Sequence, residues 1–278
     1  MKDKLYVPPL KIQGIKTKLI PLIKKIVADN TYQTWFEPFL GFGVVGFNIY
    51  PKNASFSDTN PYIIDFYNSI KNKIINEIIV QKYLEKEGEK LEKFDDKYYY
   101  EVRNRFNDNH NPLDFLFLNR SNFNGMIRFN KNGYYNVPYG HKPKRFTKAY
   151  ITKICNQIKF IQKGISENNW KFFNVSFEKM LPYISQQDFI YCDPSYIGRH
   201  VDYYNSWDEK LEILLKKLLM KTKAKFIVST WHHNKYRINN YVNTLWNDCK
   251  IQKINHFYFV GAKESNRQAI VEALLYNF

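Results

Sequence analysis

Apolar positions in the first sixty residues change from the spacing of a helix to that of strands. Between residues 15 and 28 they recur every three or four positions with lysines between them, which predicts an amphipathic helix with a basic outer face. Two short apolar runs follow, at residues 35–39 and 54–58, and a helix is expected to begin between them near Val44. This order of elements predicts a β-α-β unit, the start of a parallel sheet.

The pattern changes in the middle of the chain. From about residue 67 to 167, charged helical stretches at 74–93 and 98–105 surround a segment at 119–140 that is dense in Asn, Gly and Arg. We interpret residues 67–167 as a mainly helical inserted domain that carries a polar hairpin. The flanking segments, 1–66 and 168–278, would form one α/β domain.

The alternation of strands and helices resumes in the last third. It predicts a strand at 188–192, a helix at 208–221 and a strand at 225–230. Two further strand-like runs, at 254–260 and 268–276, are separated by a polar stretch and predict an antiparallel hairpin. The expected fold class is therefore α/β with a helical insertion.

Charge narrows the choice of partner. The chain carries 42 Lys and Arg against 26 Asp and Glu, a formal net charge of +16, which favours a polyanion: nucleic acid first, an anionic membrane surface second. No run of 18 apolar residues is present, so no membrane span is expected. The three cysteines lie far apart, without the spacing of a disulfide framework or a zinc site. With no apolar leader after Met1, we expect a soluble, reduced, intracellular protein without a bound metal.

A glycine motif lies between the first two predicted strands. Residues Gly41–Gly46 match GxGxxG, and Asp58 follows 17 residues after Gly41. Such glycines let the backbone approach a ligand, and the acid accepts hydrogen bonds from a ribose. A nicotinamide cofactor and S-adenosylmethionine both carry adenosine and both fit. Glu37 favours the second, because a carboxylate here repels a pyrophosphate but tolerates a cationic sulfonium.

The chemistry is concentrated in Asp193-Pro194-Ser195-Tyr196, at the end of the apolar run Phe189–Cys192. The N6 amino group of adenine is a poor nucleophile because its lone pair is delocalised into the ring. If the Asp193 carboxylate and the Pro194 carbonyl each accept one N–H, the lone pair turns toward a sulfonium methyl, while Tyr196 stacks on the base. The base must first be flipped out of the duplex. The alternative is an ordinary Asp-Pro turn after a strand.

The polar segment at 119–140 suits contacts with DNA bases. Arginine pairs with guanine, and asparagine with adenine, in the major groove. Phe123 or Asn124 could wedge into the gap that a flipped base leaves. The basic residues that follow suit phosphate contacts: Lys142, Lys144 and Arg145. A solvated Asn- and Gly-rich loop is the alternative.

Two adjacent histidines, His232 and His233, follow the predicted strand at 226–229. Adjacent residues on a regular strand face opposite ways, so these side chains are not expected to point at one site. A structural or DNA-facing role is favoured over metal binding or acid–base chemistry.

These segments together resemble the Dam-like adenine-N6 DNA methyltransferases. The resemblance covers nearly the full length and keeps the family's order of motifs. The shared blocks are Gln13–Lys16, Glu37–Gly43, Asp58–Pro61, Asn119–Gly140 and Tyr191–Tyr196. Residues 197–203 and 229–234 resemble the branch of the EcoRV modification methyltransferase in particular.

The resemblance implies a Rossmann-like methyltransferase domain, residues 1–66 and 168–278, with an inserted target-recognition domain, residues 67–167. It implies S-adenosylmethionine held by Lys16, Glu37, Pro38, Phe39, Gly41, Gly43, Asp58, Ser176, Phe177 and Asp193. Asp193, Pro194 and Tyr196 would form the base pocket. With the residues singled out above, the DNA-binding candidates are Arg120, Phe123, Asn124, Met126, Arg128, Asn130, Pro138, Lys142, Lys144 and Arg145.

The implied partner is double-stranded DNA with a short palindromic site and a GAT core, read by Arg128. A cognate restriction endonuclease would act on the same site without necessarily contacting this chain. The implied location is the cytoplasm, for a chain encoded by a bacterium, a phage or a mobile element.

The chain departs from the family pattern at Ser195, where the family has a second proline. Serine adds an N–H and conformational freedom, so we expect lowered activity; an impaired, DNA-reading homologue is the main alternative. RNA or protein-amide methylation is a third possibility, and a nicotinamide dehydrogenase is a distant fourth.

Overall fold

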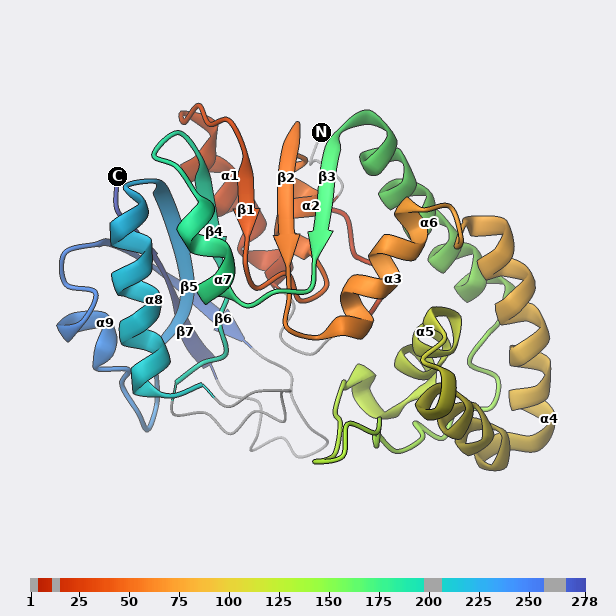
Figure 1. The fold of residues 1–278 in the computed structure, drawn as a ribbon. Helices are drawn as coiled ribbons and strands as arrows, with labels where there is room; N and C mark the ends of the chain where they lie inside the picture. The colour runs from red at the N-terminus through yellow and green to blue at the C-terminus, as the bar shows by residue number, and fades with distance from the viewer. Residues whose placement is uncertain (1–4, 12–15, 198–206, 258–268) are drawn as a thin grey trace. The chain divides into compact units, whose positions relative to one another are not determined.

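The computed structural model describes residues 5–11, 16–197, 207–257 and 269–278. Strands alternate with helices along the chain, which confirms the predicted mixed α/β class (Figure 1). The strands are β1 Trp35–Glu37, β2 Asn53–Ser57, β3 Asn169–Phe173, β4 Phe189–Cys192, β5 Lys225–Asn234, β6 Lys250–Phe257 and β7 Ala269–Tyr276.

The strands form one seven-stranded sheet in the order β3-β2-β1-β4-β5-β7-β6. β1 runs parallel to β2 and β4, and β4 runs parallel to β5. The order 3-2-1-4-5 is that of a doubly wound sheet, and β7 enters antiparallel between β5 and β6. The carboxyl ends of the parallel strands therefore lie at one edge, the place where such sheets bind ligands.

The predicted helices are present in the structure, together with others that the pattern did not predict one by one. They are η1 Lys16–Lys18, α1 Ile20–Ala28, α2 Val44–Ile49, α3 Pro61–Lys71, α4 Glu77–Asn109, α5 Pro112–Ser121, η2 Phe123–Gly125, α6 Lys148–Glu167, α7 Phe177–Met180, η3 Leu181–Tyr183, α8 Glu209–Thr222 and α9 Tyr241–Thr244. The helices predicted at 74–93 and 98–105 are the two parts of α4, which a kink with non-helical dihedrals at Asp95 separates, as predicted. Residues 119–121 end α5, so the hairpin begins later than expected.

Contacts divide the chain into two compact units. The first, here called the helical unit, comprises Met1–Ile15, Gly41–Tyr50 and Asn60–Phe172. The second, the sheet unit, comprises Lys16–Leu40, Pro51–Thr59 and Phe173–Phe278. The helical unit contains the whole 67–167 segment together with α2 and α3. The assignment of residues 67–167 to DNA reading remains a prediction.

The core of the sheet unit lies between the strands and the helices α7, α8 and α9. α8 lies beside β5 in Figure 1, and its Leu215 and Leu219 pack with Phe226 and Val228 of β5. Asp208 caps α8 by accepting a hydrogen bond from the backbone N–H of Leu211 at 2.9 Å. β4 is buried at every position, as expected of a central parallel strand.

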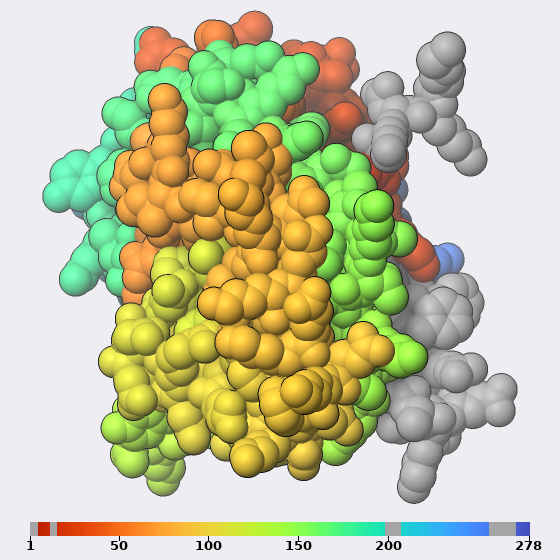
Figure 2. Space-filling view, turned by 90° about the vertical axis from the view of Figure 1, so that its right-hand side faces the viewer, coloured from red at the N-terminus to blue at the C-terminus, as the bar shows by residue number. Residues whose placement is uncertain are grey.

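The helical unit is organised by the long helix α4. Figure 2 views the unit from the side of α4 (gold to yellow), with α6 (green) beside it. Asn76 caps α4 by accepting hydrogen bonds from the N–H groups of Ile78 and Ile79. The inner face of the helix is apolar and includes Val80 and Leu84.

Candidate active site

Asp193, the first residue after β4, is held in place by the neighbouring strand β5. The Ser229 hydroxyl donates to Oδ1 of Asp193 at 2.6 Å, and the Tyr191 hydroxyl donates to Ser229 Oγ at 3.1 Å. Tyr191 and Ser229 are both buried. The chain of hydrogen bonds fixes the carboxylate without a ligand, as preorganised sites require.

Three further side chains complete a compact charged group, the Asp193 cluster, which consists of Lys16, Asp193, Tyr196 and Glu272. Lys16 Nζ lies 3.5 Å from Asp193 Oδ1 and 3.6 Å from Glu272 Oε1. The Tyr196 hydroxyl donates to Glu272 Oε1 at 2.6 Å, and Lys16 Nζ lies 4.7 Å from the Tyr196 ring centroid. The cluster joins η1, the end of β4 and β7, which are far apart in the sequence.

The electrostatics of the cluster favour a cationic ligand. Burial raises the pKa of the Asp193 carboxyl, the Lys16 charge and the Ser229 hydrogen bond lower it, and the Glu272 charge raises it further. The Asp193 side chain keeps 26% of its surface exposed, whereas that of Glu272 is fully buried. Two carboxylates against one ammonium leave a net negative site that a ligand can reach.

Sequence reasoning did not identify Glu272 as part of a site. In the sheet it lies directly opposite Trp231 of β5. The only signal in the sequence is an acidic residue within the otherwise apolar run Val271–Leu275. An ionisable residue inside a predicted strand is expensive to bury, and this cost could have marked it.

The expectation that the side chains of His232 and His233 face opposite ways is wrong, whereas their structural or DNA-facing role remains a prediction. The β5–β7 register shifts between Trp231 and His233, so His232 lies in a β-bulge. The bulge breaks the alternation of sides, and His232 Nδ1 lies 2.8 Å from His233 Nδ1. Burial lowers the pKa of His232, and the charges of Lys253 and His233 lower it further.

The sheet unit gathers several of the predicted cofactor residues. Phe39 stacks on Phe177 with ring centroids 5.4 Å apart, and Trp207, which sequence reasoning missed, contacts both rings at 5.5 and 5.6 Å. Ser176 is the N-cap residue of α7, directly before Phe177. The three rings form an aromatic group of the kind that can contact a planar heterocycle.

The remaining cofactor candidates of the sheet unit lie at the ends of β1 and β2. Glu37 is buried and accepts a hydrogen bond from Trp35 Nε1 at 3.1 Å. Pro38 follows it, and its carbonyl lies 3.5 Å from the Ser57 hydroxyl. Asp58 follows the last residue of β2 and donates its backbone N–H to Phe173 O at 3.3 Å.

The glycine loop is built as its sequence predicts. Gly41 and Gly43 have φ values of +49° and +74°, a left-handed conformation that side chains disfavour. A Cβ on Gly43 would come within 2.3 Å of the Phe47 ring. The loop therefore needs glycine at Gly43 for both conformation and space, and it opens α2 in the helical unit.

The polar segment forms a hairpin between residues 122 and 139. Isolated bridges join Asn122 with Tyr139 and Phe129 with Tyr135. Arg128 is half-buried, and its Nε and Nη2 donate to the Asn136 side chain and carbonyl at 2.8 and 3.0 Å. Among the other candidates here, Met126 is half-buried, while Phe123, Asn124, Asn130 and Pro138 are exposed.

The prediction that Arg120 contacts bases is not compatible with its position. Arg120 is 6% exposed, and its Nη2 donates to Gln157 Oε1 at 2.6 Å. The Tyr150 hydroxyl accepts a second bond from Nη1 at 3.2 Å. Arg120 lies in the last turn of the apolar helix α5, so the guanidinium stabilises the interior of the unit. Asn119 is buried beside it and pairs with the backbone of Lys11.

The basic residues after the hairpin differ in their freedom to bind phosphate. Lys142 is exposed. Lys144 is exposed and lies 3.5 Å from Glu92 in a surface ion pair, which contributes little stability. Arg145 donates to Arg120 O at 2.8 Å and to the Tyr150 hydroxyl at 2.6 Å, so it supports the base of the hairpin.

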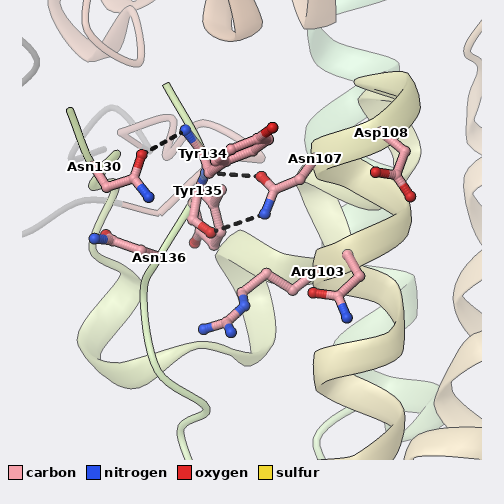
Figure 3. A pocket seen from close by; sticks show the side chains of 8 residues that line it. Arg103, Asn107, Asp108, Asn130, Tyr134, Tyr135 and Asn136 are labelled. Atoms are coloured by element: carbon pink, nitrogen blue, oxygen red, sulfur yellow. Dashed lines mark hydrogen bonds between the residues drawn. The ribbon is translucent and has the colours of Figure 1, made fainter. Parts of the chain in front are cut away.

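A polar pocket of about 360 Å³ lies between α4 and the hairpin (Figure 3). Arg103 and Asn107 line it from α4, and Asn130, Tyr134 and Asn136 line it from the hairpin. Asn107 bonds both backbone groups of Tyr135, at 2.8 and 3.2 Å. These two bonds join α4 to the hairpin at the pocket, whose lining includes amides and a guanidinium.

The described ranges contain neither a candidate membrane span nor a candidate metal site. In those ranges, the helices are all too short or too polar to cross a bilayer. The same ranges hold no group of three or more His, Cys, Asp or Glu side chains arranged to bind a metal ion.

Comparison with known proteins identifies the family of the chain. Residues 13–260 match the family described as D12 class N6 adenine-specific DNA methyltransferase. The Type II methyltransferase M.MjaIII of Methanocaldococcus jannaschii is 28% identical over 98% of this chain and 99% of its own. The Type II methyltransferase M1.LlaDCHI of Lactococcus lactis subsp. cremoris is 26% identical over 100% and 98%. The DNA adenine methylase of Haemophilus influenzae is 27% identical over 91% and 89%.

The family match covers most of the chain and confirms the resemblance to Dam-like enzymes, whereas the special likeness to the EcoRV enzyme remains a prediction. Membership of a methyltransferase family implies the use of S-adenosylmethionine. The chain belongs to the D12 class of N6 adenine-specific DNA methyltransferases.

Proposed function

We propose that this chain methylates adenine N6 within a short palindromic site of double-stranded DNA, as the modification enzyme of a type II restriction–modification system. The observation that carries the proposal is the preorganised Asp193 carboxylate. Ser229 and Lys16 both engage its Oδ1, and the Tyr196 ring is fixed nearby by Glu272. A carboxylate so held is suited to accept a hydrogen bond from an amino group.

The proposed chemistry uses Asp193 Oδ2 and the Pro194 carbonyl as the two acceptors for N6. Tyr196 would stack on the extruded adenine. S-adenosylmethionine would supply an electrophilic methyl group on a cationic sulfur. After transfer N6 must lose a proton, and Asp193, whose pKa burial raises, is suited to accept it.

The residues present fit this cofactor. The net negative charge of the Asp193 cluster suits a sulfonium, and the rings of Phe39 and Phe177 suit an adenine. We propose that Lys16, Glu37, Pro38, Phe39, Asp58, Ser176, Phe177 and Asp193 hold it, together with the glycine loop at Gly41 and Gly43.

For the DNA contacts, we retain Arg128, Phe123, Lys142 and Lys144 from the predicted set. Arg128 would read a guanine of a GAT core, because Asn136 already holds its guanidinium in one orientation. Phe123, half of whose surface is exposed, would fill the gap left by the flipped base. Lys142 and Lys144 would contact phosphates, and the net charge of +16 would make binding weaken with salt. DNA as substrate implies the cytoplasm, and a cognate endonuclease would share the site.

Ser195 supports a second candidate, a homologue that still reads its site but transfers methyl groups poorly. The test is methyl transfer from labelled S-adenosylmethionine to duplexes that contain GATC, GATATC or a scrambled sequence, with the product base identified by mass. We expect N6-methyladenine in one GAT-containing duplex only. Tight, sequence-selective binding without transfer would support the second candidate, and 4-methylcytosine would contradict both.

A further inference from the structure

We propose that Glu272 is a positioning residue for methyl transfer, which orients Tyr196 and shares the Lys16 ammonium with Asp193. The inference rests on the proposed function, because it concerns the same site. The family match ends at residue 260, so it does not include this position.

The location of Glu272 is difficult to explain by folding alone. Its side chain is fully buried on β7, followed by the buried Ala273, Leu274 and Leu275. A buried carboxylate is expensive even when it is paired, and an apolar residue of similar volume is often as stable or more so. A carboxylate at this point therefore calls for a role beyond packing.

The first role concerns Tyr196, the residue proposed to stack on the base. Its hydroxyl donates a 2.6 Å hydrogen bond to Glu272 Oε1, in the range of strong bonds to a charged acceptor. Lys16 Nζ lies against the ring face at 4.7 Å, a cation–π distance. Both contacts orient the ring before DNA arrives, which lowers the entropy lost on binding the base.

The second role concerns Lys16. Its Nζ is nearly equidistant from Asp193 and Glu272, at 3.5 and 3.6 Å, beyond the 2.7–2.9 Å usual for a charge-assisted hydrogen bond. Because Glu272 also attracts it, the ammonium does not form a short ion pair with Asp193. Without the Glu272 charge, Lys16 would move onto Asp193 and weaken it as an acceptor for N6.

Substitution of Glu272 by glutamine separates the two roles, since the amide oxygen still accepts from Tyr196 but carries no charge. Among the described residues, the charged and titratable groups that face Asp193 are Lys16, Glu272, Tyr196 and Tyr191. The Glu272 charge raises the pKa of Asp193, so its removal lowers that pKa. In Glu272→Gln the acid limb of single-turnover methyl transfer should move to lower pH, with a rate constant about tenfold lower.

Tyr196→Phe is the complementary variant, because it keeps the ring and loses the hydroxyl. We expect a rate constant about tenfold lower and an unchanged acid limb, since no charge is lost. A double variant should lose less than the product of the two single effects, because the residues act through one hydrogen bond.

Glu87→Gln is a matched control in the helical unit. Glu87 is also buried, accepts a hydrogen bond from a tyrosine hydroxyl, that of Tyr98, and pairs with a cation, Arg105. Its substitution should leave the acid limb in place. If Glu272→Gln also leaves the acid limb in place and its rate within twofold of the native chain, Glu272 is structural only and the inference is wrong.

A readout without turnover separates this inference from the proposed function. The Asp193 carboxyl can be titrated by carbon NMR, with Asp193→Asn used for its assignment. A lower pKa in Glu272→Gln supports the inference even if the native chain makes no methyladenine, which would count against the proposed function alone. An unchanged pKa contradicts the sharing of Lys16. If Glu272→Gln does not fold, an unchanged rate in Tyr196→Phe would overturn the inference.

Discussion

The two units of the chain each contain a buried group of carboxylates, tyrosines and one cation, yet the two groups are built differently. In the helical unit the Arg105 cluster consists of Tyr83, Glu87, Tyr98, Arg105 and Asp114. Arg105 donates to both oxygens of Asp114 at 2.8 and 2.5 Å and to Glu87 at 2.9 Å. In the Asp193 cluster, Lys16 keeps 3.5 and 3.6 Å from its two carboxylates.

This difference suggests that the Arg105 cluster stabilises the fold, whereas the Asp193 cluster is suited to act on a ligand. The planar guanidinium of Arg105 fits two carboxylates at once, and a point charge such as Lys16 does not. Burial acts to raise the pKa of Glu87, but hydrogen bonds from Tyr98 and Arg105 hold that pKa below its usual value. For Asp193 burial prevails, and the pKa is raised. The Arg105 cluster satisfies its charges internally, whereas the Asp193 cluster keeps a carboxylate available to a ligand.

The largest expected effect is that of Asp193→Asn on turnover. The amide cannot carry the negative charge that polarises N6, so the rate constant of methyl transfer should fall by about 10³-fold. Duplex affinity should change by less than about threefold, since phosphate contacts supply most of it. Single-turnover assays and filter binding measure the two quantities, and a rate within tenfold of native would argue against Asp193 as the acceptor.

Arg105→Ala tests whether the Arg105 cluster stabilises the fold. It leaves two buried carboxylates without their cation, and we expect the free energy of unfolding to fall by about 2–4 kcal/mol, less than for a fully buried pair because Arg105 is partly exposed. Urea denaturation followed by circular dichroism measures this. The control is Lys82→Ala, an exposed residue of the same helix, for which we expect a change below about 0.5 kcal/mol.

The two clusters should respond oppositely to pH. The raised pKa of Asp193 means that its ionised form destabilises the fold, so Asp193→Asn should be more stable than native near pH 7. That gain should shrink as the pH falls through the raised pKa. The lowered pKa of Glu87 stabilises the fold above the unfolded value, so Glu87→Gln should be less stable at pH 7. That loss should vanish as the pH falls through the lowered pKa. If the free energy of unfolding of the two variants, relative to native, changed with pH in the same direction, the comparison would be refuted.

The smallest effect is expected from Ser195→Pro. Proline at this half-buried position would stiffen the loop that carries the Pro194 carbonyl, with a gain in kcat of about twofold to fivefold. Steady-state kinetics on an unmethylated duplex that contains the recognition site measures it. An unchanged kcat would mean that the rigidity of this loop does not limit the reaction.

The sequence alone was sufficient to predict most of the parallel strands of the sheet. Apolar runs predicted β1, β2, β4 and β5, because a buried parallel strand must be apolar along its whole length. The edge strand β3 was not predicted, since only alternate positions, Trp170 and Phe172, are buried there. The β6–β7 hairpin was predicted and is confirmed by its antiparallel register, while the polar stretch that joins the strands lies outside the described residues.

The site was predictable where a motif is local in sequence and not where it is made in three dimensions. Asp193 and Tyr196 lie in one tetrapeptide, but Glu272 reaches Tyr196 across 76 positions. Arg120 was predicted to contact DNA because the residues around it have the same polar composition as the hairpin. In the structure, α5 buries its side chain. The contact between the two histidine side chains was not predicted, because a β-bulge leaves no mark in the pattern of apolar and polar residues. Residues 13–15 and 198–203, which contribute to the resemblance, lie outside the described part of the chain.

The most direct test compares Asp193→Asn with Glu87→Gln in one assay, the formation of N6-methyladenine per folded molecule in a GAT-containing duplex. Both substitutions remove a buried negative charge, one from each cluster. If the Asp193 cluster is the reaction centre, the first variant should lose about 10³-fold and the second less than about threefold. Equal losses, or a larger loss in Glu87→Gln, would contradict this account.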